Sequence, residues 1–265
     1  MSITSTLVHH AEIRFHEAAE VLHPYVGCFW VVTADRRAAI RVVPDGTTSI
    51  SIQLQEGRSS GWVLRGPLVR PEERRFESPA TLVGVRLRPG VAFLLNGVPA
   101  HATVGRRFQL TGGRFRELAA SDIAAQTPAQ CIDALQQFLI ERLTSASVHA
   151  TVARAVREIE REHGLSRVSG IAARCGVSAR HLNRLMRLWV GYGPKCFANV
   201  VRFQATLKEI DRFPAQPAVR LASETGYFDQ AHLTLVLGQL AGDTPRRLAT
   251  TSVSDFSKTR CDDAL

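Results

Sequence analysis

The chain has 265 residues, of which 45% are hydrophobic and 22% are charged. This is ordinary globular composition, and it excludes disordered, collagen-like and small disulfide-bonded proteins. The formal net charge is +9, which favours polyanionic partners such as nucleic acid or anionic lipid. Residues 151–248 carry +7 of this charge, whereas residues 1–150 carry +3, so the basic excess lies in the C-terminal third.

No apolar run approaches the roughly 18 residues of a membrane span, and residues 1–20 lack the apolar segment of a signal peptide. We therefore expect a cytoplasmic protein that makes no membrane contact. The five cysteines form no C-x-x-C pair, which argues against a disulfide framework and a thiolate zinc site. His9, His10, His16 and His23 are imidazole donors, but their spacing fits no standard site, so we expect neither metal nor cofactor.

The first part of the chain is predicted to be β-structure, because short apolar runs are separated by turn residues. Residues 49–54 alternate polar and apolar side chains, as a half-buried strand does. The other expected strands are residues 29–32, 39–43 and 82–87, and residues 91–95 indicate a short helix. A sandwich or small barrel able to enclose a ligand is the expected architecture.

Two sets of residues in this domain are candidates for contact with a ligand. The aromatic set could line a cavity or simply form the core: Phe29, Trp30, Trp62, Phe93 and His101. Arg86 and Arg88 alternate at a strand end, where they could meet an anion. They could equally only pair with acidic residues, namely Glu72, Glu73 or Glu77.

From about Arg114 the apolar spacing becomes helical, through Leu118 and Ile123 to Leu143. Thr127-Pro128 is typical of a helix start, and residues 144–147 form a small polar stretch suited to a link between domains. We place the boundaries so that residues 1–147 form a regulatory or sensor domain with connector helices. Residues 148–250 then form a second domain, and residues 251–265 form a flexible tail.

The second domain contains two similar units. Residues 171–178 (IAARCGVS) are echoed by residues 221–228 (LASETGYF) at an offset of 50. In each unit a glycine, Gly176 or Gly226, ends a short helix, and Ser178 or Asp229 serves as the N-cap of the next. Beyond the turn the offset becomes 51, and each unit is followed by a proline that opens another helix. The equivalent residues are Leu182 and Leu233, Leu185 and Val236, and Pro194 and Pro245.

These residues resemble the AraC/XylS family of bacterial transcription regulators over roughly residues 150–248. The strings that carry the resemblance are Gly176-Val177-Ser178-Ala179-Arg180-His181-Leu182 and Gly226-Tyr227-Phe228-Asp229-Gln230-Ala231-His232-Leu233-Thr234, followed by Ala241-Gly242-Asp243-Thr244-Pro245. The turn-rich N-terminal part also looks like a β-rich domain that often precedes this module.

The resemblance implies an α+β multidomain fold: a sandwich-like or barrel-like domain followed by an all-α domain with two helix-turn-helix motifs. In the family, the two recognition helices enter successive major grooves, about 10 bp apart, and a long helix joins the units, here from Pro194 to about Asp211. The residues that would contact DNA are Ser178, Arg180, Asn183, Arg184, Arg187, Gln230, Ala231, Thr234, Lys195 and Arg246.

The second recognition helix departs from the family's pattern. Leu235 stands where an arginine contact is expected, and Gly238 weakens a helix by about 1 kcal/mol relative to alanine. We therefore expect a weaker or non-specific second half-site.

The leading hypothesis is a sequence-specific DNA-binding transcription regulator, controlled through its N-terminal domain and without catalytic activity. Its expected partner is double-stranded DNA, so the protein would be associated with the nucleoid. RNA polymerase, a small-molecule effector and a second copy of the chain are left open as further partners. The alternative is a protein-interaction module that uses the apolar Leu235-Val236-Leu237 run. An enzyme hypothesis rests on Ser59 in a G-x-S-x-G string, which needs a following helix where residues 62–67 are strand-like.

Overall fold

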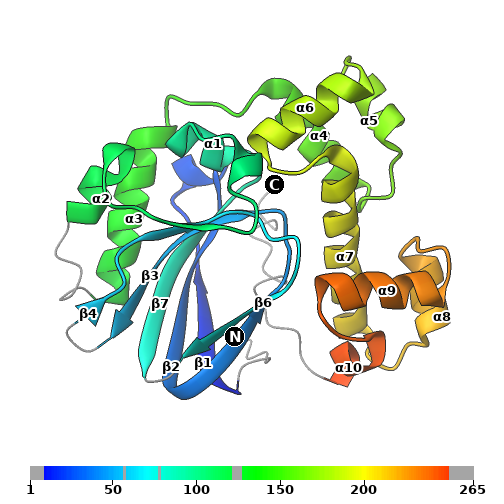
Figure 1. Cartoon of the computed structure of the whole chain (residues 1–265), viewed down its shortest axis with the longest axis horizontal. Helices are drawn as coiled ribbons and strands as arrows, with labels where there is room; N and C mark the ends of the chain where they lie inside the picture. Colours follow the sequence, from blue (N-terminus) through cyan, green and yellow to red (C-terminus); the bar gives the residue numbers. More distant parts are fainter. Residues whose placement is uncertain (1–8, 56–57, 77–78, 121–126, 251–265) are drawn as a thin grey trace.

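The computed structural model describes residues 9–55, 58–76, 79–120 and 127–250. A β-rich part is followed by an all-helical part, which confirms the predicted α+β architecture (Figure 1). The tail expected over residues 251–265 lies outside the described residues, and so does Ile123 of the expected connector.

One antiparallel sheet forms the N-terminal part, with its strands ordered β1-β2-β7-β3-β5-β8; β4 pairs with β3, and β6 pairs with β2. The strands are β1 (His9–His16), β2 (Val26–Val42), β3 (Thr48–Gln55), β4 (Arg58–Ser59), β5 (Val63–Arg65), β6 (Glu72–Phe76), β7 (Ala80–Leu87) and β8 (Arg107–Gln109). The runs 29–32 and 39–43, predicted as separate strands, both fall in β2, which ends at Val42. This strand passes through the charged residues between the runs because its first half pairs with β7 and its second half pairs with β6.

The two faces of the sheet have different partners. Ile50 and Ile52 on β3 belong to the core under the helices, whereas Ser49 and Ser51 alternate with them onto the other face. The helices over the first face are α1 (Val91–Asn96), α2 (Arg116–Ala120) and α3 (Pro128–Leu143). Short 3₁₀ turns, η1 (Glu20–Leu22), η2 (Ala100–Ala102) and η3 (Gly113–Phe115), link these elements. Thr127 caps α3 in a reciprocal capping box with Gln130, at the predicted helix start.

The helical part has two cores joined by one long helix. Its elements are α4 (Ala150–Arg161), α5 (Val168–Arg174), α6 (Ala179–Trp189), α7 (Pro194–Arg212), α8 (Ala218–Glu224), α9 (Gln230–Leu240) and α10 (Pro245–Thr250). α7 places Phe197 in the first core, with α4, α5 and α6, and Phe203 in the second core, with α8 and α9. None of the described helices is long and apolar enough to cross a membrane. The predicted boundary near residue 147 stays a prediction; residues 144–149 lie between α3 and α4.

The sheet and the helical part touch at several places along α6 and α7. The ring of Phe93 on α1 lies 4.7 Å from that of Trp189 at the end of α6. The hydroxyl of Tyr192 donates to the carbonyl oxygen of Leu68. The side-chain amide of Gln204 on α7 donates to the carbonyl oxygen of Pro44 at 2.6 Å. These contacts fix the position of the linking helix against the β-rich part.

Candidate nucleic-acid interface

The two repeated units form matching helix-turn-helix turns. Gly176 has a φ of 69° and Gly226 a φ of 72°, in the left-handed region that glycine adopts without strain. The Ser178 hydroxyl accepts from the amide of His181 at 3.2 Å, and the Asp229 carboxylate accepts from the amide of His232 at 2.7 Å. Since the capped helices α6 and α9 begin at Ala179 and Gln230, the offset of 51 places them in equivalent positions.

Helix α6 divides into a buried and an exposed face, as its sequence spacing predicts. Leu182, Leu185 and Met186 are buried in the first core. The opposite face exposes four polar side chains at spacings of three and four residues: Arg180, Asn183, Arg184 and Arg187. At about 1.5 Å rise per residue these positions extend over roughly 10 Å, which is a length that the major groove accommodates.

The charged side chains of this exposed face are largely free of internal contacts. Within the described ranges, no hydrogen bond or ion pair engages Arg180 or Arg187. Arg184 has only the ring nitrogen Nδ1 of His181 near it, 3.4 Å from its Nη2. The amide oxygen of Asn183 lies against Gly193, where an added Cβ would come within 2.3 Å of it. The three guanidinium groups are therefore available to base edges or phosphates.

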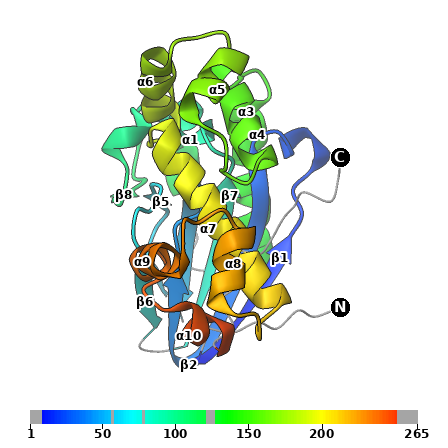
Figure 2. The same cartoon turned by 90° about the vertical axis from the view of Figure 1, so that its right-hand side faces the viewer.

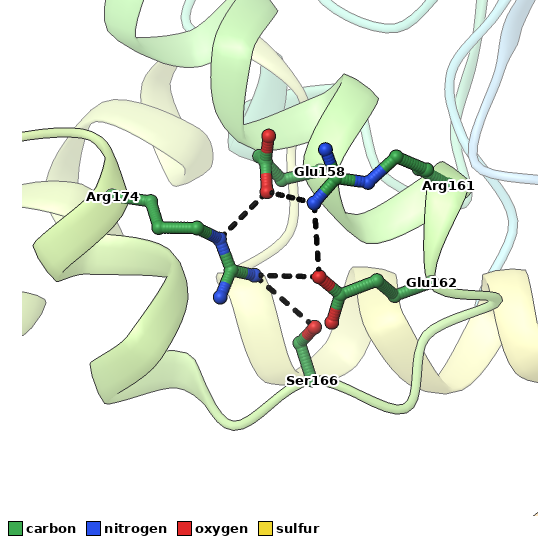
Figure 3. Close-up of polar contacts among 5 residues, drawn as sticks. All are labelled: Glu158, Arg161, Glu162, Ser166 and Arg174. Carbon is green, nitrogen blue, oxygen red and sulfur yellow. Dashed lines mark hydrogen bonds and ion pairs between the residues drawn. The ribbon is translucent and has the colours of Figure 1, made fainter.

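An ion-pair network joins α4 to α5 in the first unit (Figure 3). Arg174 on α5 donates from Nε to Glu158 at 2.6 Å, and its Nη2 lies 3.1 Å from Glu162 and 3.3 Å from the Ser166 hydroxyl. Arg161 contacts the same two carboxylates, at 2.8 and 3.1 Å. Because Glu158 is on α4, the network ties α4 to the first helix of the unit and supports the position of α6.

Helix α9 presents a different surface from α6, although both lie on the same side of α7 in Figure 2. At the offset of 51, the exposed positions of α6 become Ala231, Thr234, Leu235 and Gly238, none of which carries a charge. The Thr234 hydroxyl donates to the carbonyl oxygen of Gln230 at 2.8 Å. No arginine or lysine occurs between Gln230 and Leu240.

The apolar run of α9 is not the continuous patch that the sequence suggests. Leu235 is 59% exposed, but Leu237 is fully buried in the second core and Val236 is half-buried against it. The helical period turns consecutive residues to different sides, so a run of three apolar residues cannot form one surface. Phe228, just before α9, is 91% exposed.

Two further candidates lie at the starts of the helices that follow the units. Lys195 is exposed in the first turn of α7, and Arg246 is exposed in α10. The structure therefore places all ten predicted positions on or beside α6, α7, α9 and α10, while their contacts with DNA stay predictions.

The N-terminal candidates take different places. Phe29 and Trp62 belong to the core under the helices, and His101 is exposed in η2. Of the acidic partners suggested for Arg86 and Arg88, Glu72 pairs with Arg65 and Arg107, Glu73 pairs with Arg75, and Glu77 lies outside the described residues. The Nε of Arg86 lies 3.3 Å from the carboxylate of Asp45, and the Nε of Arg88 donates to the carbonyl oxygen of His23 at 2.7 Å. These pairings depend on which distant segments meet in the folded structure, and the sequence does not show that.

Two cavities adjoin Arg86. A larger one, of about 650 Å³, lies between the sheet and α7 and is lined by both acidic and basic side chains, including Arg88, Arg202 and Glu209. A smaller one, of about 40 Å³, lies on the sheet face away from α1–α3. It is lined by Trp30 and by Arg65 and Arg74, two residues that the sequence did not single out. The sequence pattern that could have identified Arg74 is the side-chain alternation in β6, which puts Arg74 on the same face as buried Phe76.

The described residues give no geometric support to a catalytic serine or to a metal site. Ser59 lies in the two-residue strand β4; the next element is strand β5, so the helix of a nucleophile elbow does not follow. Among the described residues, no group of three or more His, Cys, Asp or Glu side chains is placed to hold a metal ion.

The comparisons with known proteins match the two parts of the chain separately. Residues 171–251 match a family described as "Helix-turn-helix domain", and residues 14–109 match "Domain of unknown function (DUF6597)". No curated protein matches the chain.

Among solved structures, ToxT from Vibrio cholerae O395 is similar with a TM-score of 0.43 and 7% identity, covering 85% of this chain and 98% of ToxT. Unsaturated fatty acid bound wild-type ToxT from Vibrio cholerae strain SCE256 has a TM-score of 0.41 and 9% identity, with 94% and 98% covered. The AraC-like transcriptional activator CuxR has a TM-score of 0.21 and 11% identity, with 67% and 80% covered. At these scores the likenesses carry no argument about function.

Proposed function

We propose that the chain is a DNA-binding transcription regulator of the AraC family that reads its DNA site mainly with α6; the match of residues 171–251 to a helix-turn-helix domain supports this proposal. The observation that carries the proposal is the difference between the two recognition helices. α6 exposes three arginines and an asparagine on one face, whereas the equivalent positions of α9 are uncharged.

The residue types of the two helices account for the proposed difference in base reading between α6 and α9. Arginine reads guanine through two hydrogen bonds, asparagine reads adenine in the same way, and a good pair contributes about 1–3 kcal/mol of discrimination. Alanine, leucine and glycine at the matching positions of α9 offer no such hydrogen bonds, although Gln230 remains exposed at its first turn. The second unit would then occupy the next major groove with weaker base preference.

The test is a selection of bound sequences from random DNA with the full chain, at 50 and 200 mM salt. We expect one strongly enriched block, bound by α6, and a weaker block about 10 bp away. The double substitution Arg180→Ala with Asn183→Ala should remove the strong block. Arg116→Ala, an exposed arginine on α2, is the matched control and should leave the selected site unchanged.

Two outcomes would contradict this proposal. No enrichment at either salt would refute sequence-specific binding, and two equally strong blocks would refute the dominant role of α6. The protein-interaction alternative rests on exposed Phe228 and Leu235. It would gain support if the double variant bound DNA as before.

Regulation of DNA binding would act through the contacts of α6 and α7 with the β-rich part. A ligand of the β-rich part shifts DNA affinity only if it binds the two arrangements of these contacts with different affinity. Chromosomal DNA as the target places the protein beside the nucleoid.

A further inference from the structure

Buried charge lies on one face of the sheet, outside the recognition helices. β6 pairs with the second half of β2, with Ile40 opposite Arg74. Along β6 the side chains alternate, so that Glu72, Arg74 and Phe76 are less exposed than Glu73 and Arg75. This alternation turns Arg74 towards the sheet face opposite α1–α3, beside the cavity of about 40 Å³.

Three arginines from three different strands line this cavity. Arg65 on β5 and Arg86 on β7 are each only 8% exposed, and Arg74 on β6 is half-buried. We call these three residues and the cavity between them the arginine pocket. The carboxylate of Asp45 and the hydroxyl side chains of Thr47, Ser49 and Ser51 also line it.

The carboxylates near the pocket are fewer than its arginines; one of them, Asp45, lines the pocket and lies 3.3 Å from Nε of Arg86. Glu72 is shared, because its Oε2 lies 3.6 Å from Nη1 of Arg65 while its Oε1 accepts a hydrogen bond from Arg107. Arg74 donates to the neutral amide oxygen of Gln53 at 3.4 Å and, in the part of the chain that the structure describes, forms no ion pair. Buried charge of one sign is costly unless a counter-charge accompanies it.

The titration of these groups agrees with an excess of positive charge. Burial lowers the pKa of Arg65 to about 10; the nearby charge of Arg107 acts in the same direction, and the carboxylate of Asp45 acts against it. Burial likewise lowers the pKa of Arg74 to about 10, with a further contribution from Arg65. Both groups still carry their proton at neutral pH, so an anion between them would be stabilised.

We propose that the arginine pocket binds a small oxyanion with two negative charges, of the size of hydrogen phosphate or sulfate. Guanidinium groups bind such oxyanions through paired hydrogen bonds, and serine hydroxyls add further donors. A volume of about 40 Å³ holds roughly three water molecules, which is the size range of a small oxyanion.

The pocket is also adjacent to the contacts that hold α7. Arg86 and Asp45 line both the arginine pocket and the larger cavity against α7. Asp45 follows Pro44, whose carbonyl oxygen accepts from Gln204 of α7. An oxyanion that competes with Asp45 for Arg86 would therefore act on the junction between the two domains; this regulatory role rests on the proposed function, whereas binding itself does not.

The direct test is titration calorimetry and thermal unfolding of the full chain with inorganic phosphate, with the ionic strength held constant by sodium chloride. We expect saturable binding and a Tm that rises with phosphate, a similar result with sulfate, and none with acetate. Arg74→Gln should weaken phosphate binding at least tenfold. Arg75→Gln, its exposed neighbour on β6, is the matched control and should bind as the wild type does.

Absence of saturable binding to the wild type, or an equal loss in the Arg75→Gln variant, would overturn the proposal. A second variant decides the case if Arg74→Gln does not fold. Ser51→Asp puts a fixed carboxylate into the pocket, and it should fold, raise the Tm without phosphate and abolish the response to phosphate. Unfolding of this variant, or an undiminished response, would also overturn the proposal.

The coupling to DNA is measured separately, as the affinity for the selected site with and without phosphate. Phosphate bound without an effect on DNA affinity would refute the coupling alone. Conversely, failure of sequence-specific DNA binding would leave the calorimetric result standing, so the two proposals fail independently.

Discussion

Substituting Leu235 by arginine on α9 tests directly whether this helix faces DNA. Leu235 is 59% exposed and contributes little to the second core, unlike its neighbours Leu233 and Leu237, which are fully buried. The substitution should therefore change the free energy of unfolding by less than about 0.5 kcal/mol. It adds a cation at the position equivalent to Arg184 of α6, from which a guanidinium group can reach a phosphate or a base.

The expected gain follows from the release of counterions. Each phosphate that is neutralised steepens the slope of log K against log salt by about 0.9, so one added contact increases the affinity lost between 50 and 200 mM salt by roughly 3.5-fold. Binding at 50 mM salt should tighten at the same time. A gain is more informative than a loss here, because misfolding can mimic a loss but not a steeper salt slope.

The assay is fluorescence anisotropy with the selected DNA site at 50, 100 and 200 mM salt, for the wild type, Leu235→Arg and Val21→Arg. Val21 lies in η1 of the β-rich part and is 48% exposed, so its substitution adds the same charge away from the recognition helices. An unchanged slope in Leu235→Arg, or an equally steep one in Val21→Arg, would refute the placement of α9 at the DNA.

Three further predictions concern the helices that position the interface, all measured by urea unfolding. Leu182→Ala, at a fully buried position of α6, should lower the free energy of unfolding by about 2–5 kcal/mol, and a loss below 1 kcal/mol would contradict the assigned core. Ser178→Ala removes the N-cap of α6 and should cost about 1 kcal/mol, whereas Ser178→Asp should keep most of the stability; equal losses would argue against the cap. Gly191→Ala should cost about 1–3 kcal/mol, because φ is +95° and the new Cβ would lie 2.9 Å from Val104; unchanged stability would refute this close approach.

The helical part was predictable because its signals are local. Each unit has a glycine at its turn, a capping side chain (Ser178 or Asp229) and apolar residues at helical spacing. Within one unit these signals lie within about 20 residues of one another, and together they predict helices, turns and exposed faces. The same spacing predicted that Leu182 is buried and Arg180 exposed. It did not predict that Leu237 is core while Leu235 is exposed, since three adjacent apolar residues do not indicate which of them faces inward.

The β-rich part was predictable only in outline. The strand periods were visible, but β2 was read as two strands, because its charged middle resembles a turn until its pairing with β7 and then with β6 is known. The arginine pocket was missed for the same reason. Arg65, Arg74 and Arg86 are 21 residues apart from first to last and reach one cavity only because β5, β6 and β7 reach the same side of one sheet.

The two-part architecture, the duplicated turn and the exposed polar face of α6 could therefore be predicted from the sequence. These features depend on interactions between residues close together in the chain, where spacing and residue type are enough. The partner of Arg86, the separation of Leu235 from Leu237 and the gathering of Arg65, Arg74 and Arg86 around one cavity are decided by the tertiary structure. Such features depend on which distant segments meet, and strand pairing brings them together without leaving a pattern in any one segment.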